Sequence, residues 1–234
     1  MEFPFKSTKT WHQAFPVAYR QWKADSHCRI LHGYALTIHL EFGCLELDAR
    51  NWAVDFGGLR GLKGQLEDWF DHTTLVAVDD PEIELLRELG RRKVAKITEV
   101  ERTGCEGLAD FIFEHLNDGW LSINGYADRV ICTKVEVRET DSNMAFRELT
   151  TKDYLRFTQA SLDRLPKLPS DFQYNQQPNG ILSIEKAGST KATISLHAAP
   201  GYTSSHSEGR YLRQHEAVLA ELEYLRPTPN KDKK

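Results

Sequence analysis

A cysteine and a histidine four residues apart form the most suggestive chemical cluster of the sequence, within the segment Ser26–Tyr34 (SHCRILHGY). Cys28 and His32 lie where a loop is expected to lead into a strand, and a thiol near an imidazole can supply a nucleophile or a base beside a ligand. Taken alone, Cys28 is equally typical of a small, inert apolar side chain. The spacing therefore indicates a candidate site and leaves its chemistry open.

Two further candidates are the adjacent pair Asp71–His72 and the single carboxylate of Glu139. A carboxylate can orient a neighbouring imidazole and stabilise its charged form for proton transfer, but the same pair could cap the end of a helix. Glu139 ends a segment whose same-face neighbours are apolar. A carboxylate in such surroundings is costly unless a partner binds it, such as the paired N–H donors of a guanidine-like heterocycle. A glutamate at a strand end also commonly faces water.

Two segments that alternate with a period of two are expected to position these residues. Residues 32–42 place His32, Tyr34 and four apolar side chains on one face, and residues 130–139 show the same alternation up to Glu139. This period, with β-branched and aromatic members, predicts strands. A weaker strand is predicted over residues 8–20, where Pro16 indicates an edge or a bulge.

Helical spacing appears in three stretches between these strands. The first follows Asp55, which is expected as its N-cap, and covers residues 59–70; the second covers 81–90. The third begins at Thr103–Glu106, which has the spacing of a capping box. With a fourth strand expected at residues 144–148, the order predicts an α+β fold, an antiparallel sheet with helices on one face.

The composition limits the class of protein. The chain has 234 residues, with 30 basic and 34 acidic side chains and a net charge of −4, and 40% of its residues are hydrophobic. This balance excludes a disordered or collagen-like chain, and mild acidity gives no basic surface for direct nucleic-acid binding. There is no apolar run of the roughly 18 residues that a membrane span needs, no signal-like start and no C-x-x-C pair. We therefore expect a soluble, cytoplasmic protein with reduced thiols.

The character of the chain changes after about residue 150, so we expect one domain over residues 1–150 and a C-terminal extension over 151–234. The extension is predicted to contain a helix over Lys152–Leu162, a linker over Pro166–Gly180, a hairpin formed by Ile181–Lys186 and Lys191–His197, an amphipathic helix over Tyr211–Leu225 and a solvated tail over Pro227–Lys234.

Five short motifs occur in order along the first two thirds of the chain. They are Cys28-x-x-x-His32-Gly33, Trp52–Leu59 (WAVDFGGL), Phe70–Leu75 (FDHTTL), Cys105–Ala109 (CEGLA) and Val135–Thr140 (VEVRET). Each motif is modest alone, but the ordered series resembles the 6-pyruvoyl-tetrahydropterin synthase / 6-carboxy-tetrahydropterin synthase family. The four-residue spacing from Cys28 to His32 is more similar to the 6-carboxy branch, which serves 7-deazaguanine (queuosine precursor) synthesis.

The resemblance implies a tunnelling fold in which subunits join their sheets into a barrel, a homohexamer, and active sites built between chains. It also implies a pterin substrate, 7,8-dihydroneopterin triphosphate, which the 6-carboxy branch converts to 6-carboxy-5,6,7,8-tetrahydropterin. By the same resemblance Cys28 is the proton-abstracting thiolate, Asp71 and His72 form a proton relay, and Glu139 anchors the amino-pyrimidine edge of the pterin. Glu106, Tyr19 and Tyr34 are the further residues expected at the substrate.

The resemblance also implies a zinc ion held by three histidines, and here the sequence departs from the pattern. Tyr19 and Tyr34 stand at two of the three ligand positions, and His32 at the third. Three neutral imidazoles make a sound zinc site, whereas a phenol must first lose a proton at a pKa of about 10. A site of His32 with two tyrosines stays open, as do His12 or His27 as substitutes. Without a metal, the two hydroxyls are expected to stabilise an enediolate as hydrogen-bond donors.

Two functions from different classes follow. One is a variant lyase of the 6-carboxy-tetrahydropterin synthase type, because the thiol, the relay and the anchoring carboxylate are all retained. The other is a pterin-binding or assembly protein that keeps the fold and has lost the chemistry along with the zinc ligands. The extension over residues 151–234 motivates the second, since amphipathic helices often make subunit or partner contacts.

Overall fold

Two compact units make up the chain. One comprises Phe5–Gly43 and Leu47–Leu149, and the other comprises Met1–Pro4, Cys44–Glu46 and Thr150–Lys234. The computed structural model describes residues 2–126, 129–158, 165–176, 181–196, 202–206, 210–211 and 214–225. Every candidate site residue of the sequence analysis belongs to the first unit.

A six-stranded sheet forms the centre of the first unit, in the strand order β4-β3-β1-β2-β5-β6. Its strands are β1 (Phe5–Tyr19), β2 (His32–Cys44), β3 (Thr73–Ala77), β4 (Lys96–Val100), β5 (Val130–Arg138) and β6 (Met144–Glu148). β5 and β6 are antiparallel, whereas β3 runs parallel to the end of β1 and β4 runs parallel to β3. The predicted α+β class is confirmed. The sheet is mixed, however, because the short strands β3 and β4 extend it in parallel.

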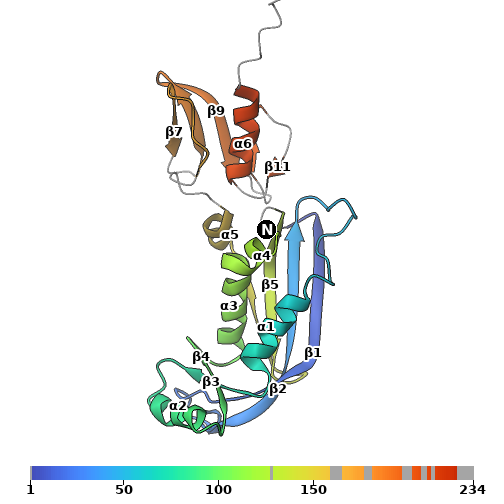
Figure 1. The fold of residues 1–234 in the computed structure, drawn as a ribbon, viewed down its shortest axis with the longest axis vertical. Helices are drawn as coiled ribbons and strands as arrows, with labels where there is room; N and C mark the ends of the chain where they lie inside the picture. The colour runs from blue at the N-terminus through green and yellow to red at the C-terminus, as the bar shows by residue number, and fades with distance from the viewer. Residues whose placement is uncertain are drawn as a thin grey trace, which may run out of the picture. The chain divides into compact units, whose positions relative to one another are not determined.

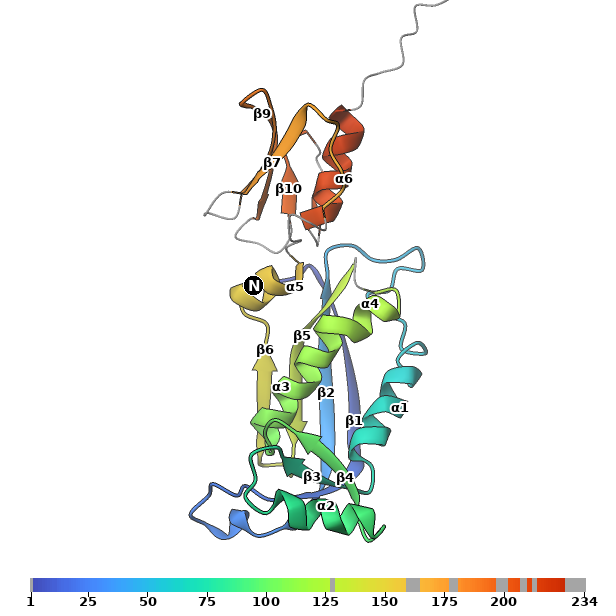
Figure 2. The ribbon, with the colours of Figure 1, turned by 60° about the vertical axis from the view of Figure 1, so that its left-hand side comes forward.

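Helices cover one face of the long strands. They are α1 (Arg60–Phe70) and α3 (Cys105–His115), the second continuing through a π-helical turn η2 (Leu116–Trp120) into α4 (Leu121–Ile123). The remaining helix, α2 (Ile83–Arg91), packs on the short strands β3 and β4. α1 and α3 lie on the same side of the sheet in both ribbon views (Figures 1 and 2). The predicted helical stretches are all present, each beginning one to two residues later than its pattern indicated.

The alternation predicted for β2 is confirmed. Its apolar face is fully buried against the helices, through Leu36, Ile38, Leu40 and Phe42. The irregularity expected in β1 lies at Gln13, which has a φ of 45° and donates its N–H to the hydroxyl of Thr37 (2.8 Å). β1 lies between β3 and β2, so this is a bulge-like irregularity of an internal strand and not a sheet edge.

Both predicted helix caps are wrong. The residue before α1 is Leu59, which makes no capping hydrogen bond, and the Asp55 carboxylate instead accepts from the N–H of Gly57 (2.8 Å). The residue before α3 is Gly104, and the hydroxyl of Thr103 donates to the carbonyl of Arg20 (2.8 Å). The Asp55 carboxylate bonds within the loop before α1, and the Thr103 hydroxyl bonds to the residue after β1. Neither side chain therefore caps the helix that its sequence pattern predicted.

The second unit is built on a five-stranded antiparallel sheet, in the order β11-β10-β9-β8-β7. Its elements are α5 (Thr151–Thr158), β7 (Phe172–Gln176), β8 (Leu182–Lys186), β9 (Ser189–Leu196), β10 (Tyr202–Ser204), β11 (Arg210–Tyr211) and α6 (Gln214–Leu225). Leu182, Ile184 and Ile194 from the sheet are fully buried, as are Ala217 and Val218 from α6. The unit therefore has an apolar core of its own.

Several predictions for the extension can be compared with these elements. The hairpin is present, with Ala187 and Gly188 at positive φ in its turn. α5 covers the first part of the predicted helix Lys152–Leu162, whose residues 159–162 lie outside the described ones. α6 matches the second predicted helix except at its start, because Tyr211 belongs to β11. The predicted linker is partly wrong, because it contains β7. The tail Pro227–Lys234 lies outside the described residues. In the parts of the chain that the structure describes, none of the helices is long and apolar enough for a membrane span.

Candidate active site

A cavity of about 380 Å³ opens where β1 ends and where β2 and α3 begin. Six of the eight predicted site residues line it, namely Tyr19, Cys28, His32, Tyr34, Glu106 and Glu139. They come from separate elements: the end of β1, the 3₁₀ turn η1 (His27–Arg29), the start of β2, the start of α3 and the residue after β5. They meet because β1, β2 and β5 are successive neighbours in the sheet.

Three contacts hold the frame of this cavity. The Arg20 guanidinium donates to both carboxylate oxygens of Asp80, at 2.8 Å from Nε and 2.5 Å from Nη2. The Arg20 hydrogen bonds hold the pKa of the Asp80 carboxyl below its usual range. Gly104 has a φ of 89°, and a Cβ there would collide with the side chain of Gln21, whose amide donates to the Thr103 carbonyl (3.2 Å). The Arg20–Asp80 contact ties the residue after β1 to the segment before α2, and the Gln21–Thr103 contact ties the next residue to the segment before α3.

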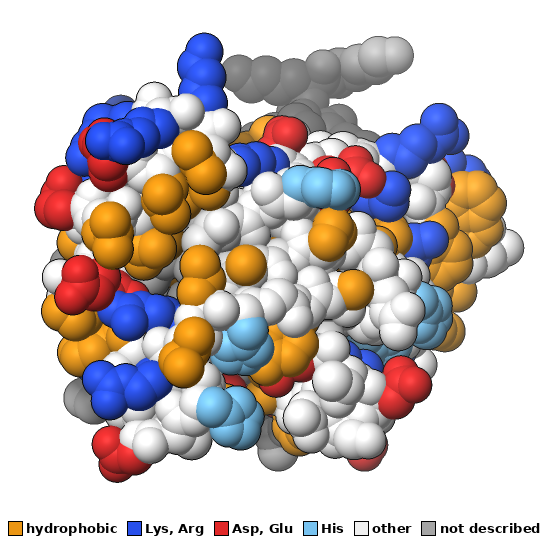
Figure 3. All heavy atoms as spheres, turned by 90° about the horizontal axis from the view of Figure 1, so that it is seen from below, with side chains coloured by type: hydrophobic (Ala, Val, Ile, Leu, Met, Phe, Trp, Pro, Cys, Tyr) orange, Lys and Arg blue, Asp and Glu red, His pale blue; other side chains and the backbone are white. Residues whose placement is uncertain are grey.

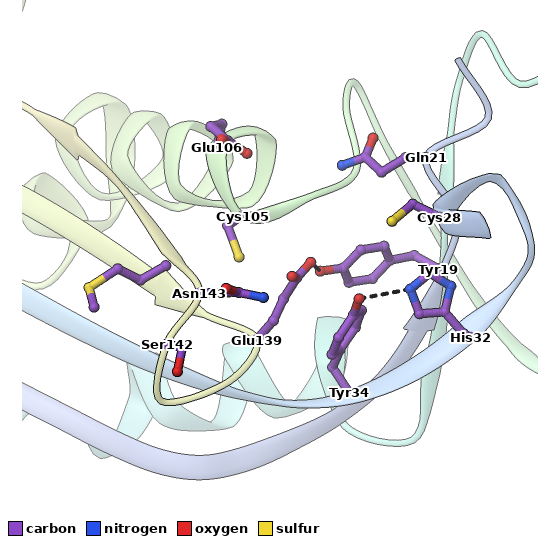
Figure 4. A pocket seen from close by; sticks show the side chains of 11 residues that line it. Tyr19, Gln21, Cys28, His32, Tyr34, Cys105, Glu106, Glu139, Ser142 and Asn143 are labelled. Atoms are coloured by element: carbon purple, nitrogen blue, oxygen red, sulfur yellow. Dashed lines mark hydrogen bonds between the residues drawn. The ribbon is translucent and has the colours of Figure 1, made fainter. Parts of the chain in front are cut away.

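Tyr19 and Glu139 form the innermost pair of the cavity. Tyr19 is only 1% exposed, and its hydroxyl donates to the Glu139 carboxylate. Figure 4 shows the two groups pointing toward each other. Burial, and then the neighbouring Glu139, raise the pKa of Tyr19 far above that of a free phenol. Tyr19 is therefore a neutral donor that fixes one oxygen of the carboxylate predicted to anchor a substrate.

His32 and Tyr34 form a second pair, beside the first. The His32 Nδ1 lies 2.5 Å from the Ile30 carbonyl, which can only accept, so Nδ1 carries a proton. In the neutral ring Nε2 then accepts from the Tyr34 hydroxyl, at 2.7 Å (Figure 4). Burial, and then Glu139, raise the pKa of Tyr34 as well. The Tyr19 and Tyr34 rings lie 5.4 Å apart between centroids, so the two pairs are in contact.

Two thiols enter the cavity from different elements. Cys28 is half-buried in η1, where its backbone N–H donates to the Ser26 hydroxyl (3.4 Å). Cys105 begins α3 and is buried; burial, followed by the carboxylates of Glu139 and Glu106, raises the pKa of its thiol to about 12. Cys105 is thus held as a neutral thiol, and Cys28 is the more accessible sulfur.

Asp71 and His72 lie elsewhere on the first unit. His72 lines a separate groove of about 560 Å³ formed by residues at β1, β2, β3 and β4, and this groove shares Tyr34 with the cavity. The His72 Nδ1 is 2.9 Å from the Asp71 carboxylate, and its side chain is 83% exposed. Figure 3 shows the end of this unit where α2 lies, with histidine side chains at the surface between apolar ones. Within one chain, the predicted relay does not reach the cavity.

Sequence reasoning missed several residues of the cavity wall. These are Gln21, Cys105, Ser142, Asn143 and Met144. Cys105 was inside one of the recognised motifs, and Gln21 lies two residues after Tyr19, so position along the chain could have indicated both. Asn143 belongs to the turn after β5, where its carbonyl accepts from the Glu139 N–H (3.1 Å). No sequence pattern marks that contact.

Comparison with known proteins gives a family for this part of the chain. The family model described as 6-pyruvoyl tetrahydropterin synthase matches residues 8–149. The chain belongs to this family. The tunnelling fold expected from the motifs is thereby confirmed, and the cavity lies within the matched region. No curated protein sequence matches the chain.

Two solved structures are similar to part of the chain, and the first of them supports the same fold. An uncharacterized protein from Wolinella succinogenes is similar at 19% identity and a TM-score of 0.53, over 62% of this chain and 97% of that one. The 6-pyruvoyl tetrahydropterin synthase of Caenorhabditis elegans matches at 18% identity and a TM-score of 0.40, over 64% of this chain and 99% of that one. Both matches leave more than a third of this chain uncovered.

The residues at the expected metal position do not fit zinc. Both phenols keep their protons, and those of Tyr19 and Tyr34 are directed to Glu139 and to the His32 ring. Among the described residues, no group of three or more His, Cys, Asp or Glu side chains could hold a metal ion. The suggested substitutes His12 and His27 are both exposed. Only His32 has the orientation of a ligand, with one ring nitrogen fixed on a carbonyl.

Proposed function

We propose that this family member is a lyase of the 6-carboxy-tetrahydropterin synthase type. Its substrate would be 7,8-dihydroneopterin triphosphate, which takes up one water and yields triphosphate, acetaldehyde and 6-carboxy-5,6,7,8-tetrahydropterin, a precursor for 7-deazaguanine (queuosine) synthesis. The observation that carries the proposal is the meeting of an accessible thiol, Cys28, and a strand-end carboxylate, Glu139, in one cavity of the family region.

Each wall of the cavity has a part in this proposal. Glu139 accepts from the amino-pyrimidine edge of the pterin through the carboxylate oxygen that Tyr19 leaves available. Cys28, which lines the same cavity from η1, removes a proton from the side chain of the bound pterin. Glu106, exposed in the first turn of α3, lies at the cavity rim and contacts the polar side chain of the substrate.

The Asp71–His72 relay requires a second copy of the chain. In a homohexamer of the expected kind, the exposed His72 of one subunit would complete the cavity of another. The 83% exposure of its side chain and its distance from its own cavity both support this assignment. The oligomer is part of the proposal.

Product analysis tests the proposed reaction. The pure protein is incubated with 7,8-dihydroneopterin triphosphate, with and without added zinc, and acetaldehyde, triphosphate and the pterin product are measured. We expect acetaldehyde, triphosphate and the pterin product to form in equimolar amounts. A Glu139→Gln variant should bind the pterin about 10-fold to 100-fold more weakly, because it loses a charge-assisted hydrogen bond. The absence of product in both conditions, with pterin binding intact, would falsify catalysis.

Two observations favour a second candidate, a pterin-binding or assembly protein without catalysis. The relay residues and the thiol do not meet within one chain, and the second unit has a core of its own that the family model does not cover. Tight pterin binding with no product, in a protein whose mass in solution is that of an oligomer, would support this candidate over the lyase.

A further inference from the structure

Two tyrosines occupy the centre of the cavity, and each is already paired with another residue of its wall. Tyr19 donates to the carboxylate of Glu139, and Tyr34 donates to Nε2 of His32. A metal ion binds through oxygen or nitrogen lone pairs and displaces any proton that points at it. At both tyrosines the proton is committed to a neighbouring side chain, so each hydroxyl is arranged to orient a partner.

Both ring nitrogens of His32 are also hydrogen-bonded already. Its Nδ1–H is fixed on the Ile30 carbonyl, which leaves Nε2 as its one lone pair, and the Tyr34 hydroxyl occupies that lone pair at 2.7 Å. A zinc ion at Nε2 would have to displace the hydroxyl and would gain one imidazole and two neutral phenols. Structural and catalytic zinc sites use three or four thiolate, imidazole or carboxylate ligands.

We infer that this cavity holds no zinc ion, and that Tyr19 and Tyr34 act instead as positioning residues, Tyr19 for the Glu139 carboxylate and Tyr34 for the His32 ring. The two hydroxyls lie on adjacent rings, 5.4 Å apart between centroids, so they form one hydrogen-bonded wall. A ligand in the cavity meets a carboxylate and an imidazole whose orientations are set before it binds. Such a wall suits the part of a ligand that carries hydroxyl and N–H groups, which both donate and accept hydrogen bonds.

Zinc binding itself tests this inference. Tag-free protein is equilibrated with zinc chloride, dialysed, and analysed for metal by mass spectrometry. The wild type is compared with His32→Ala, with Tyr19→His/Tyr34→His, and with the matched control Tyr19→Phe/Tyr34→Phe. Wild type, His32→Ala and the Phe variant should retain equal, small amounts of zinc. The His variant provides three imidazoles and should retain about one additional zinc per chain.

Two results would overturn the inference. If the wild type retains about one zinc per chain more than His32→Ala, the cavity is a metal site after all. If the His variant has the wild-type circular dichroism spectrum and gains no zinc, the tyrosines are not what excludes the metal. The comparison of wild type with His32→Ala decides the first point even if the His variant does not fold. Metal content is measured without a substrate, so the outcome is independent of whether the proposed reaction takes place.

Discussion

The cavity at the end of β1 and the Asp71–His72 pair differ in how firmly the chain holds their polar groups. Tyr19 is 1% exposed and bonded to Glu139, and the Tyr34 hydroxyl is bonded to His32. The side chain of His72 is exposed. Among the described residues, its ring pairs with the carboxylate of Asp71. A single chain therefore preorganises the binding groups of the cavity but leaves the Asp71–His72 pair exposed.

The largest expected effect tests the cavity side of this contrast. Cys28→Ala should lower turnover of 7,8-dihydroneopterin triphosphate by about 100-fold to 10,000-fold, because it removes the proposed base, while pterin affinity stays unchanged. Turnover and binding are measured separately, by acetaldehyde release and by fluorescence titration.

Cys105 provides the matched thiol for this test, since it lines the same cavity. Its pKa of about 12 keeps it neutral near pH 7, so it cannot serve as the base. Cys105→Ala should lower turnover by less than about 10-fold, the scale of a packing change. Equal losses in the two variants would remove the special role of Cys28.

The next effect tests the exposed pair. His72 has a φ of 52°, a conformation that asparagine also tolerates, so His72→Asn removes the imidazole without adding backbone strain. If the pair completes the cavity of another subunit, turnover should fall by about 100-fold with the free energy of unfolding unchanged. His12→Asn, an exposed histidine of β1, is the control. Wild-type turnover in His72→Asn would exclude the pair from the mechanism.

A third prediction concerns the frame that holds the cavity. Asp80 is 3% exposed and accepts two hydrogen bonds from Arg20, so Asp80→Ala leaves a guanidinium without its carboxylate. We expect a loss of about 2–3 kcal/mol in the free energy of unfolding, measured by urea denaturation at neutral pH. Asp79→Ala is the matched control, because the neighbouring Asp79 is exposed and its contacts with Lys23 and Trp22 lie at the surface. An equal loss in both variants would contradict a framing role for Asp80.

The same variant has a predictable pH dependence. The Arg20 hydrogen bonds lower the pKa of Asp80 in the folded chain below its unfolded value of about 4. The carboxylate therefore stabilises the fold fully above about pH 4, and this contribution is lost as the pH falls through the folded pKa. The difference in stability between wild type and Asp80→Ala should shrink below about pH 4.

The sequence predicted the elements of the first unit that have a clear period and failed where tertiary contacts decide. β2 alternates over many residues, so its buried face could be identified residue by residue. β3 (TTLVA) and β4 (KITEV) do not alternate apolar and polar residues, and both were missed. Asp55 and Thr103 have good capping chemistry, but the Asp55 carboxylate accepts from Gly57 in the loop before α1, and the Thr103 hydroxyl donates to the distant Arg20 carbonyl.

The same division applies to the cavity. Four of the six predicted residues that line the cavity lie in the motifs, and Tyr19 and Tyr34 come from the expected metal-ligand positions. The structure brings them together because β1, β2 and β5 are neighbours in the sheet. The pairing of Tyr19 with Glu139 spans 120 positions of sequence, and that of Gln21 with Thr103 spans 82. Contacts of that separation leave no local pattern, so the organising role of the tyrosines is visible only in three dimensions.

A fourth prediction uses thiol reactivity to sharpen the contrast between accessible and buried groups. Cys28 is half-buried, whereas Cys44 and Cys132 are fully buried and Cys105 has a pKa of about 12. Near pH 7, iodoacetamide should modify Cys28 at least about 10-fold faster than the other three, as followed by peptide mass spectrometry. Equal rates at all four would show that the cavity opens by unfolding.

The smallest effect separates the two hydrogen bonds within the cavity itself. Tyr19→Phe should cost about 1.5–3 kcal/mol, because a buried hydroxyl that donates to a carboxylate is lost, whereas Tyr34→Phe should cost about 0.5–1.5 kcal/mol, because its partner is a neutral imidazole in a half-buried position. Both losses are read from urea denaturation of the ligand-free protein. Since Tyr19 orients the carboxylate that would hold the ligand, Tyr19→Phe should also weaken pterin binding more than Tyr34→Phe does. A larger cost at Tyr34, in either measurement, would mean that the His32 pair and not the Glu139 pair organises the cavity.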